Sequence, residues 1–282
     1  MRALLASHGL RPTKALGQNY LVDPNTARKV ARLAGVEPGE TVLEIGPGLG
    51  SLTLALREAG ARVVAVEADE RLLPALAEAL GDDPCVRVVA GDALRLDLAG
   101  LAPEAHKLVA NLPYNLAATI VLEVLTSYPG YRRLTVMVQR EVGERLAAPP
   151  ATSGYGATSV KVAALAEARL LAPVGRKVFL PEPHVDSVLV GLERRRHPAT
   201  AGVPWQVLDR VIEAAFSQRR KTLRNSLRTL GLDQEGVEAI GRAAGIDLGL
   251  RAERLDVAGF AALAAAFQAA PQPLNRRGDG PF

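Results

Sequence analysis

The chain is poor in cysteine, histidine and long apolar runs. Its 282 residues contain one cysteine, Cys85, so a disulfide within the chain is excluded and a reducing environment is expected. No segment approaches the roughly 18 consecutive apolar residues that a membrane helix needs, and residues 1–25 lack the apolar core of a secretion signal. We therefore expect a cytoplasmic protein with no membrane partner.

The sequence also lacks the spacing of a metal site. The four histidines lie far apart, and none stands at ligand spacing from Cys85. They are His8, His106, His184 and His197. The sequence consequently predicts no bound metal.

Apolar residues make up 48% of the chain, enough for one large α/β domain and a small second domain. Short apolar segments alternate with segments of helical periodicity, which is typical of βαβ units and a largely parallel sheet. Asp23 and Pro24 predict the start of the first helix, as a capping carboxylate and a proline at the first position. The expected strands are residues 41–45, 62–66, 86–90, 107–110 and 134–138, with an antiparallel pair at 169–173 and 187–192. The expected helices before the second domain are residues 26–34, 49–59, 70–80, 117–125, 139–148 and 158–166.

The composition changes along the chain and predicts four parts. Residues 1–22 are expected to form an irregular N-terminal arm, and residues 23–197 form the sheet domain. A stretch with Pro and Gly at 197–204 marks a boundary, beyond which no strand pattern occurs. Residues 204–270 are therefore expected to form a small all-helical domain, and the Pro-, Gly- and Arg-rich residues 271–282 a disordered tail. The expected helices of the small domain are residues 205–216, 222–230, 234–244 and 257–267.

A glycine-rich turn, Glu44-Ile45-Gly46-Pro47-Gly48-Leu49-Gly50, follows the first expected strand. Such a turn lets the backbone approach a ligand closely and directs amides at it. The spacing of Gly46, Gly48 and Gly50 differs from the Gly-x-Gly-x-x-Gly of dinucleotide sites, because position 51 is serine. With Glu44 ahead of it, the motif favours S-adenosylmethionine as the cofactor. A tight structural turn is the alternative.

Further acidic residues follow the next two strands. Glu67 could accept hydrogen bonds from both ribose hydroxyls of a nucleoside, in an NAD enzyme as well. Asp69 is expected to face solvent or to cap the next helix. In Gly91-Asp92-Ala93, the Asp92 carboxylate could accept from an adenine amino group, with an ordinary cap as the alternative. Since adjacent parallel strands end at one edge of a sheet, these residues predict a nucleoside pocket there.

The run Asn111-Leu112-Pro113-Tyr114 follows the fourth expected strand. The exocyclic amine of adenine is a poor nucleophile, because its lone pair is delocalised into the ring. The Asn111 side-chain oxygen and the Leu112 carbonyl can accept its hydrogens, so that orientation and electrostatics assist methyl transfer without a strong base. Pro113 stiffens the turn, and Tyr114 offers a face for stacking the base. A plain exit from the strand is the alternative.

A base inside a duplex cannot reach such a pocket, so the target must be flipped out or unpaired. A second aromatic ring would sandwich the base against Tyr114. Phe179 stands in a proline-rich loop just before the strand expected at 187–192, which makes it our candidate. A buried core position is the alternative for this ring.

These motifs resemble those of the ribosomal RNA adenine N6-dimethyltransferases, and most closely the bacterial members that act on 16S rRNA. The resemblance covers about residues 14–267. It includes Leu16-Gly17-Gln18-Asn19-Tyr20-Leu21, where Tyr20 replaces a more common Phe, and the motif that runs from Phe179 to Ser187. Later motifs at residues 215–223 and 251–255 also match. The resemblance implies a Rossmann-like class I S-adenosylmethionine-dependent methyltransferase sheet with a small all-helical C-terminal domain.

The resemblance also implies which residues act. It assigns cofactor binding to Gln18, Asn19, Leu21, Glu44, Gly46, Gly48, Glu67, Asp92, Ala93 and Asn111. It assigns the target base to Asn111, Leu112, Pro113, Tyr114 and Phe179.

The formal net charge of +4 is mildly basic, but arginine and lysine occur in clusters. One cluster, at the start of the helical domain, contains Arg219, Arg220, Lys221 and Arg224, and we expect it to contact rRNA phosphates. A second, Arg194-Arg195-Arg196, closes a strand, and the presence of two such clusters beside a base-modifying motif favours phosphate contacts for both. Solvated helix and strand ends are the alternative for either cluster.

The implied activity is two successive methylations of each of two adjacent adenosines near the 3′ end of 16S rRNA. The substrate would be the small (30S) ribosomal subunit or its precursor, and the enzyme a monomer. A macrolide-resistance methyltransferase of 23S rRNA shares the catalytic motifs, but Leu-Gly-Gln-Asn and the Gln-Arg-Arg-Lys segment, expected to be helical, argue against it. A DNA adenine methyltransferase would more often carry Asp or a second proline in the tetrapeptide. A mainly non-catalytic rRNA-binding assembly factor is the hypothesis from another class.

Overall fold

The computed structural model describes residues 2–10, 18–218 and 220–270. The chain divides into two compact units. The first unit consists of Met1–Ala147 and Leu165–Arg196, and the second of Ala148–Ala164 and His197–Phe282. No helix among the described residues is both long enough and apolar enough to cross a membrane.

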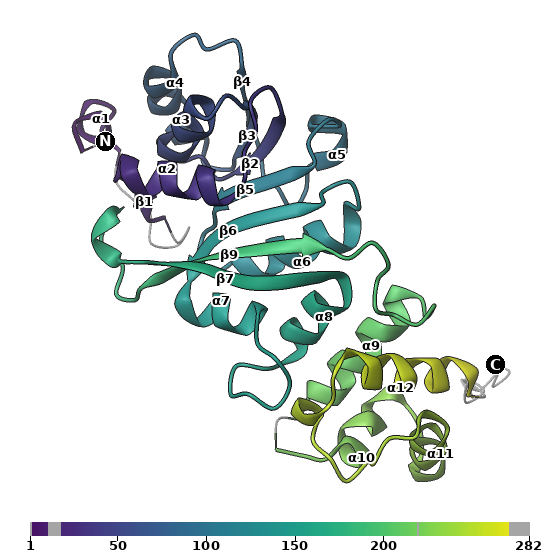
Figure 1. Cartoon of the computed structure of the whole chain (residues 1–282). Coiled ribbons are helices and arrows are strands. Elements are labelled where there is room, and N and C mark those ends of the chain that lie inside the picture. The colour runs from purple at the N-terminus through teal and green to yellow at the C-terminus, as the bar shows by residue number, and fades with distance from the viewer. Residues whose placement is uncertain (1, 11–17, 219, 271–282) are drawn as a thin grey trace, which may run out of the picture. The chain divides into compact units, whose positions relative to one another are not determined.

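A seven-stranded sheet forms the first unit, in the order β4-β3-β2-β5-β6-β9-β7 (Figure 1). Strands β2 to β6 pair in parallel, and β9 runs antiparallel to both β6 and β7. The strands are β2 Thr41–Ile45, β3 Arg62–Glu67, β4 Val86–Ala90, β5 Lys107–Asn111, β6 Arg133–Gln139, β7 Ala166–Val174 and β9 Ser187–Arg194. The seven expected strands and the antiparallel pair are thereby confirmed.

Apolar runs explain the central strands. Val42 and Leu43 on β2 are fully buried, and so are the neighbouring side chains of β3 and β5, because helices cover both faces of the sheet. Ile45 on β2 pairs with Val66 on β3, and Glu44 on β2 pairs with Val109 on β5. This register brings the carboxyl ends of β2, β3 and β5 to the same edge.

Helices α2 and α3 cover one face of the sheet, and α6 and α7 lie on the other; Figure 1 shows α2 and α6 on opposite sides. Helix α2 begins as expected, with Asp23 accepting from Thr26 N at 2.8 Å and Pro24 in the first position. On α7, a Cβ at Gly143 would lie 2.2 Å from a Val188 methyl, so only glycine allows this close packing. The helical segments of the first unit are α2 Pro24–Leu33, α3 Ser51–Glu58, η2 Glu70–Leu72, α4 Leu73–Leu80, α5 Leu98–Leu101, α6 Ala117–Ser127, α7 Arg140–Leu146 and η3 Arg176–Val178.

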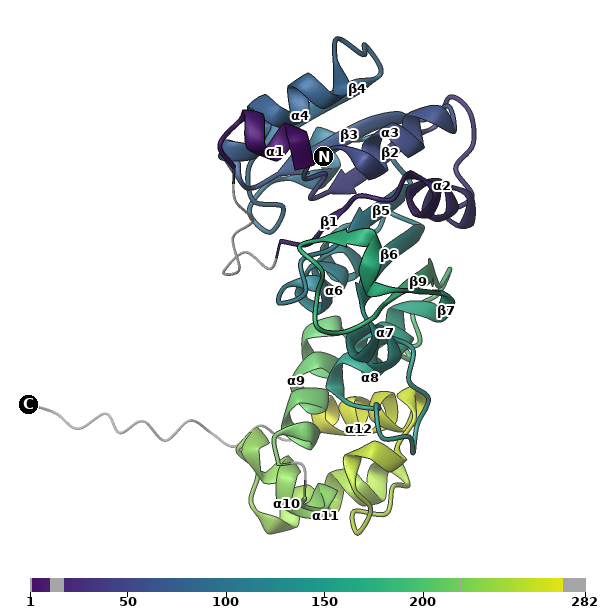
Figure 2. The same ribbon diagram turned by 90° about the vertical axis from the view of Figure 1, so that its left-hand side faces the viewer.

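The expectation of a wholly irregular N-terminal arm is wrong. Residues Arg2–Ser7 form helix α1, which lies beside α4 (Figure 2), and Tyr20–Leu21 form strand β1. Strand β1 pairs antiparallel with β8, Phe179–Leu180. Both elements are too short to show a periodic pattern in the sequence, and tertiary packing stabilises them. Leu5 and Tyr20 belong to a small core that also contains Leu49, Leu72 and Ala75.

The second unit is helical among its described residues. Its helical segments are α8 Ala157–Leu165, α9 Trp205–Phe216, α10 Leu223–Ser226, η4 Leu227–Leu230, α11 Gln234–Ala244, η5 Ala252–Arg254 and α12 Val257–Ala269. Residues Ala148–Ala164 belong here, although the sequence placed them in the sheet domain. The reason is long-range bonding: the Tyr155 hydroxyl donates to Leu255 O at 2.7 Å, and Lys161 binds Asp209 at 2.7 Å. Residues 271–282, the expected disordered tail, lie outside the described residues.

Arg194 has a structural role in the first unit. Its guanidinium donates to the carbonyl oxygens of Val124, Leu125, Tyr128 and Tyr131 at 2.9–3.2 Å, which satisfies the carboxyl end of α6. The side chain is half-buried, and burial lowers its pKa. The interpretation of this arginine as part of a phosphate-binding cluster is therefore wrong.

Replacing Arg194 by methionine should destabilise the first unit. The change keeps an apolar stem but removes donors to four carbonyl oxygens, and hydrogen bonds that involve a charged group each contribute about 1.5–3 kcal/mol. Water can replace most of these donors at a helix end, so we expect a net loss equal to about one such bond, about 2 kcal/mol, which corresponds to roughly 4–8 °C in the thermal midpoint. Circular dichroism melting checks this, with Arg196→Met at an exposed position as the control. Equal midpoints for the two variants would contradict the capping role.

Candidate active site

A pocket lies at the carboxyl edge of the sheet, where the sequence predicted it. It is formed by the ends of β2, β3 and β5 together with the residues next to β1. The lining residues are Gln18, Asn19, Tyr20, Gly46, Gly48, Glu67, Asp69, Leu72, Asn111, Leu112, Pro113 and Tyr114. The structure thus brings most of the predicted cofactor and target residues into one pocket. Tyr20, Asp69 and Leu72 are additions that the sequence analysis did not assign to it.

The glycine turn has the backbone that a close approach requires. The backbone φ angles of Gly46, Gly48 and Gly50 are +72°, +58° and +83°. Residues that carry a Cβ rarely adopt this left-handed region. A Cβ at Gly48 would lie 2.9 Å from the Tyr20 ring. The turn is therefore packed from one side by Tyr20, and glycine is required at position 48 by both conformation and space.

Glu67 is buried at the end of β3, with 6% of its surface exposed. Its Oε2 accepts from Gly48 N at 3.0 Å, and its Oε1 accepts from Asp69 N at 2.9 Å. Burial raises the pKa of Glu67, while these two hydrogen bonds act in the opposite direction. Each carboxylate oxygen keeps a second lone pair, so Glu67 can still accept from a pair of hydroxyls in the pocket.

Glu44 is deeper in the protein and is only 1% exposed. Among the described residues, neither of its oxygens makes a hydrogen bond of ordinary length, and the Thr53 hydroxyl beside it is the group placed to donate to it. Burial raises the pKa of Glu44 to about 8, and the nearby charge of Glu67 adds to the shift, whereas Thr53 opposes it. Glu44 lies on β2, two residues before Gly46, and its side chain does not line the pocket, so the structure does not show this predicted cofactor residue in contact with the pocket.

Asn111 has an orientation that the structure explains. Its side-chain Nδ2 donates to the backbone oxygen of Asn19 at 3.0 Å. A carbonyl oxygen only accepts, so the NH₂ group must face Asn19 and Oδ1 is the atom left to accept from a substrate. The residue that follows is anchored as well, since Leu112 N donates to Met137 O at 3.1 Å.

Tyr114 is held at its phenol end. Its hydroxyl lies 2.8 Å from Ser187 Oγ, and Ser187 is fully buried at the start of β9. Burial raises the pKa of Tyr114. The ring lines the pocket with its hydroxyl tethered, which restrains the stacking surface. Ser187 belongs to the motif recognised in the sequence, but no position in the sequence predicts that it meets Tyr114, 73 residues away.

Phe179 and Leu21 lie elsewhere. Phe179 is 3% exposed and packs in the main core with Leu21, against which it pairs across β1 and β8. Neither side chain lines the pocket. The core alternative for the Phe179 ring is the one the structure supports, and a stacking role requires that this ring move. Leu21 contributes its backbone instead, since Leu21 O accepts from the Ser51 hydroxyl at 2.5 Å.

Asp92 forms a local turn at the end of β4. Its Oδ1 accepts from Leu94 N at 3.0 Å, which is the cap that the sequence analysis left open. Asp92 is exposed and Ala93 is buried, and neither lines the pocket. Gly91 N donates to Glu67 O at 2.8 Å, so the turn adjoins the pocket edge next to Glu67. A contact from Asp92 to an adenine remains a prediction.

In the basic cluster of the second unit, Arg220 and Lys221 lie in the turn that connects α9 and α10, so the expectation that the Gln-Arg-Arg-Lys segment is helical is wrong for them, whereas Arg224 lies in α10. Arg220 and Lys221 are exposed, and Arg219 lies outside the described residues. Arg224 is exposed and pairs with Glu238 at 2.6 Å. A shallow hollow beside this turn is lined by Gln218, Lys221, Asn225, Arg228 and Thr229. Its donors are of the kinds that contact phosphates.

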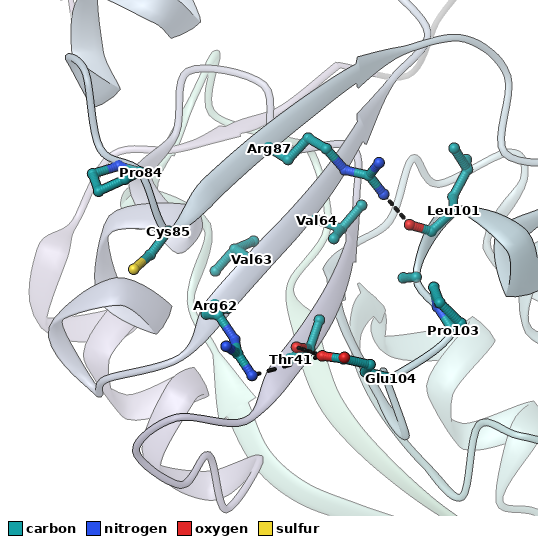
Figure 3. Close-up of a pocket in the computed structure, with 11 residues that line it drawn as sticks. Thr41, Arg62, Val63, Val64, Pro84, Cys85, Arg87, Leu101, Pro103 and Glu104 are labelled. Carbon is teal, nitrogen blue, oxygen red and sulfur yellow. Dashed lines mark hydrogen bonds and ion pairs between the residues drawn. The ribbon is translucent and has the colours of Figure 1, made fainter.

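A separate cavity lies at the amino ends of β2, β3 and β4, the edge opposite the pocket (Figure 3). Arg62 faces Glu104 there at 3.6 Å, and the Arg87 guanidinium donates to Leu101 O. None of the predicted site residues lines this cavity. Across the described ranges, His, Cys, Asp and Glu side chains form no group of three or more that could hold a metal.

Comparisons with known proteins agree with this geometry. The model of the ribosomal RNA adenine dimethylase family matches residues 10–269. Ribosomal RNA small subunit methyltransferase A of Thermobifida fusca is 48% identical over 270 residues, which cover 94% of this chain and 93% of that protein. The protein of the same name from Magnetococcus marinus is 43% identical over 268 residues, with 94% and 95% covered.

Solved structures show the same fold. A dimethyladenosine transferase from Plasmodium falciparum superposes with a TM-score of 0.74 at 23% identity, covering 88% of this chain and 97% of that chain. The 23S rRNA methyltransferase ErmE superposes with a TM-score of 0.65 at 26% identity, covering 89% and 100%. The sheet and its edge pocket define a Rossmann-like class I S-adenosylmethionine-dependent methyltransferase with a helical C-terminal region. The chain belongs to the ribosomal RNA adenine dimethylase family.

Replacing Glu44 by glutamine should change how stability depends on pH. The folded protein holds the pKa of Glu44 at about 8, above its ordinary value of 4.5, so between these values it binds a proton that the unfolded chain has released. The wild-type free energy of unfolding therefore falls as the pH rises through this window, by at most about 1.4 kcal/mol per pH unit from this group. In the Glu44→Gln variant, the free energy of unfolding should not show this decrease with pH.

Thermal midpoints of both proteins across this pH range provide the measurement. The variant should gain stability relative to the wild type toward the alkaline end, and Glu37→Gln at an exposed position is the control. Parallel profiles for Glu44→Gln and the wild type would show that the folded protein holds Glu44 ionised.

Proposed function

We propose that this protein transfers methyl groups from S-adenosylmethionine to N6 of two adjacent adenosines near the 3′ end of 16S rRNA. The product is N6,N6-dimethyladenosine, and the substrate is the small ribosomal subunit or its precursor. The observation that carries the proposal is the hydrogen bond from Asn111 Nδ2 to Asn19 O, because it leaves Asn111 Oδ1 as an acceptor in the pocket. The relatives named small subunit methyltransferase A support the choice of rRNA.

The pocket residues fit the cofactor. The glycine turn leaves no side chain between its backbone and the pocket, and Glu67 keeps lone pairs for the ribose hydroxyls. The bound cofactor supplies an electrophilic methyl group on a sulfonium sulfur. Gly46, Gly48 and Glu67 would hold it, with Asn19 and Asn111 at the boundary with the target base.

The chain's own groups then prepare the amine. Asn111 Oδ1 would accept one hydrogen and the carbonyl of Leu112 the other, so that the nitrogen lone pair is freed from the ring as the nitrogen–carbon bond forms and the carbon–sulfur bond of the sulfonium breaks, its electrons returning to sulfur. Tyr114 stacks on the base and stays in place through its bond to Ser187. The extra proton on the methylated nitrogen leaves only after methyl transfer, so the pocket needs no strong base.

Two alternative functions differ from this proposal in the substrate or in the need for catalysis. The 23S rRNA methyltransferase ErmE shares the fold, so a large-subunit substrate is the second candidate. An rRNA-binding assembly role is compatible with the same basic turn. We propose a cytoplasmic monomer that binds its subunit through the second unit.

Methyl transfer to isolated ribosomal subunits tests the proposal. Undermethylated small subunits should take up about four methyl groups each, while large subunits and DNA take up none. Asn111→Ala should lower the rate about 100-fold or more, because it removes an acceptor used in the transition state, and it should leave subunit binding unchanged. Asn25→Ala, at an exposed position of α2, is the control. Labelling of large subunits would reject the 16S assignment, and full activity of Asn111→Ala would reject the mechanism.

Neutralising Arg219, Arg220 and Lys221 together tests the basic turn. We expect weaker binding to small subunits. The slope of the logarithm of the binding constant against the logarithm of the salt concentration should become shallower by roughly 2–3, since each lost phosphate contact removes about 0.7–0.9 from it. Cofactor affinity should be unchanged. The control neutralises Arg32, Arg62 and Arg87, which are exposed cations of the first unit. An identical slope for the cluster variant and the wild type would rule out phosphate contacts by this turn.

A further inference from the structure

Gln18 is engaged with protein groups at both ends of its side chain. Its Nε2 donates to Asp69 Oδ2 at 2.7 Å, and its Oε1 accepts from the Tyr20 hydroxyl at 2.8 Å. A carboxylate only accepts, so the NH₂ group must face Asp69 and the Tyr20 hydroxyl must be the donor. These contacts indicate that Gln18, which was predicted to bind the cofactor, acts mainly by holding other parts of the protein.

Asp69 is a fixed anchor for this contact. It is 8% exposed, and Arg71 donates to it through both Nε and Nη2 at 2.7 Å. The Arg71 guanidinium and the Gln18 amide lower the pKa of Asp69, so the carboxylate is ionised. Asp69 N also donates to Glu67 Oε1, which ties the anchor to the end of β3. A two-point arginine–carboxylate pair restricts orientation as well as position. The sequence expectation that Asp69 caps the next segment is confirmed, and the alternative of a solvent-facing side chain is wrong.

Asn19 lies between two anchored residues. Gln18 is bound to Asp69, and Tyr20 is 6% exposed with its ring against Gly48. Strand β1 contains only Tyr20–Leu21, so its pairing with β8 does not include Asn19. The peptide unit of Asn19 is planar, and its carbonyl direction follows from where its neighbours are held. That carbonyl accepts from Asn111 Nδ2, which decides how the Asn111 amide is turned.

We propose that Gln18, Asp69 and Arg71 form a latch that positions the Asn111 amide for methyl transfer by holding the backbone of Asn19. The inference rests on the proposed function of Asn111. The three are positioning residues, since they act through Asn19 and Asn111 on the target amine. If they served only to seat the cofactor, losing them would raise the cofactor concentration needed and would leave the rate at saturation intact.

Two variants open the latch from different sides. Gln18→Met removes the side-chain hydrogen bonds to Asp69 and Tyr20 with little change in volume. Arg71→Met removes the arginine that binds Asp69, and the Arg71 side chain is 59% exposed. The matched control is Arg28→Met, because Arg28 pairs with Glu58 through the same two nitrogens and has a side chain 52% exposed. A variant that fails to fold is recognised by its thermal midpoint, and the exposed Arg71 keeps the test available in that case.

The first measurement does not depend on activity. The side-chain amide resonances of Asn111 are identified in isotope-labelled protein from their loss in Asn111→Ala. In the wild type one hydrogen of this amide should be protected from exchange by Asn19 O. Both latch variants should lose the protection, and Arg28→Met should keep it. Unchanged protection in both latch variants would overturn the proposal.

The second measurement is the single-turnover rate of methyl transfer to undermethylated small subunits at saturating S-adenosylmethionine. The latch variants should be slower by about tenfold or more, since small misplacements of an orienting group carry large rate penalties. Cofactor dissociation constants should change much less. A rate restored to the wild-type value by saturating cofactor would overturn the positioning role. Absence of transfer by the wild type would instead reject the proposed function, and the amide measurement would still decide whether the latch orients Asn111.

Discussion

Parallel pairing of β2 with β3 and β5 is the constraint on which the site depends. The pairs Ile45–Val66 and Glu44–Val109 place the ends of three strands at the same level, so the glycine turn, Glu67 and Asn111 share one pocket. Helices on both faces bury this sheet, and burial makes its register costly to change. The glycine turn, Glu67 and Asn111 are therefore positioned by the ends of these three strands.

The protein only partly satisfies the polar groups at the pocket and next to it. Glu67 accepts two backbone amides, whereas Glu44 is buried and makes no hydrogen bond of ordinary length among the described residues. Leaving a carboxyl in this state costs stability, and burial raises its pKa to about 8 to keep it neutral. The Asn111 amide is also partly satisfied: its NH₂ group donates to Asn19 O, and its Oδ1 is left to accept from the substrate.

Most of the fold could be predicted from local patterns. Strands β2 to β6 follow from apolar runs, and α2 follows from Asp23 and Pro24, because each depends on residues close in the sequence. Elements held by distant partners could not be predicted. Strand β1 has two residues and exists through β8, and residues 148–164 join the second unit through contacts such as Tyr155 with Leu255. Arg194 looked like a phosphate ligand, but its donors are used by the end of α6.

The sequence by itself determined the chemical inventory of the site: the Glu44 to Gly50 turn, Glu67 and the run from Asn111 to Tyr114. These follow from spacing, because a glycine turn after a strand and a polar residue after the next are local features. The tertiary structure decided which groups are already engaged. It paired Asn111 with Asn19 and Tyr114 with Ser187, and it placed Phe179 in the core. These hydrogen-bond partners lie 92 and 73 residues apart and are brought together by the sheet topology, which no local pattern encodes.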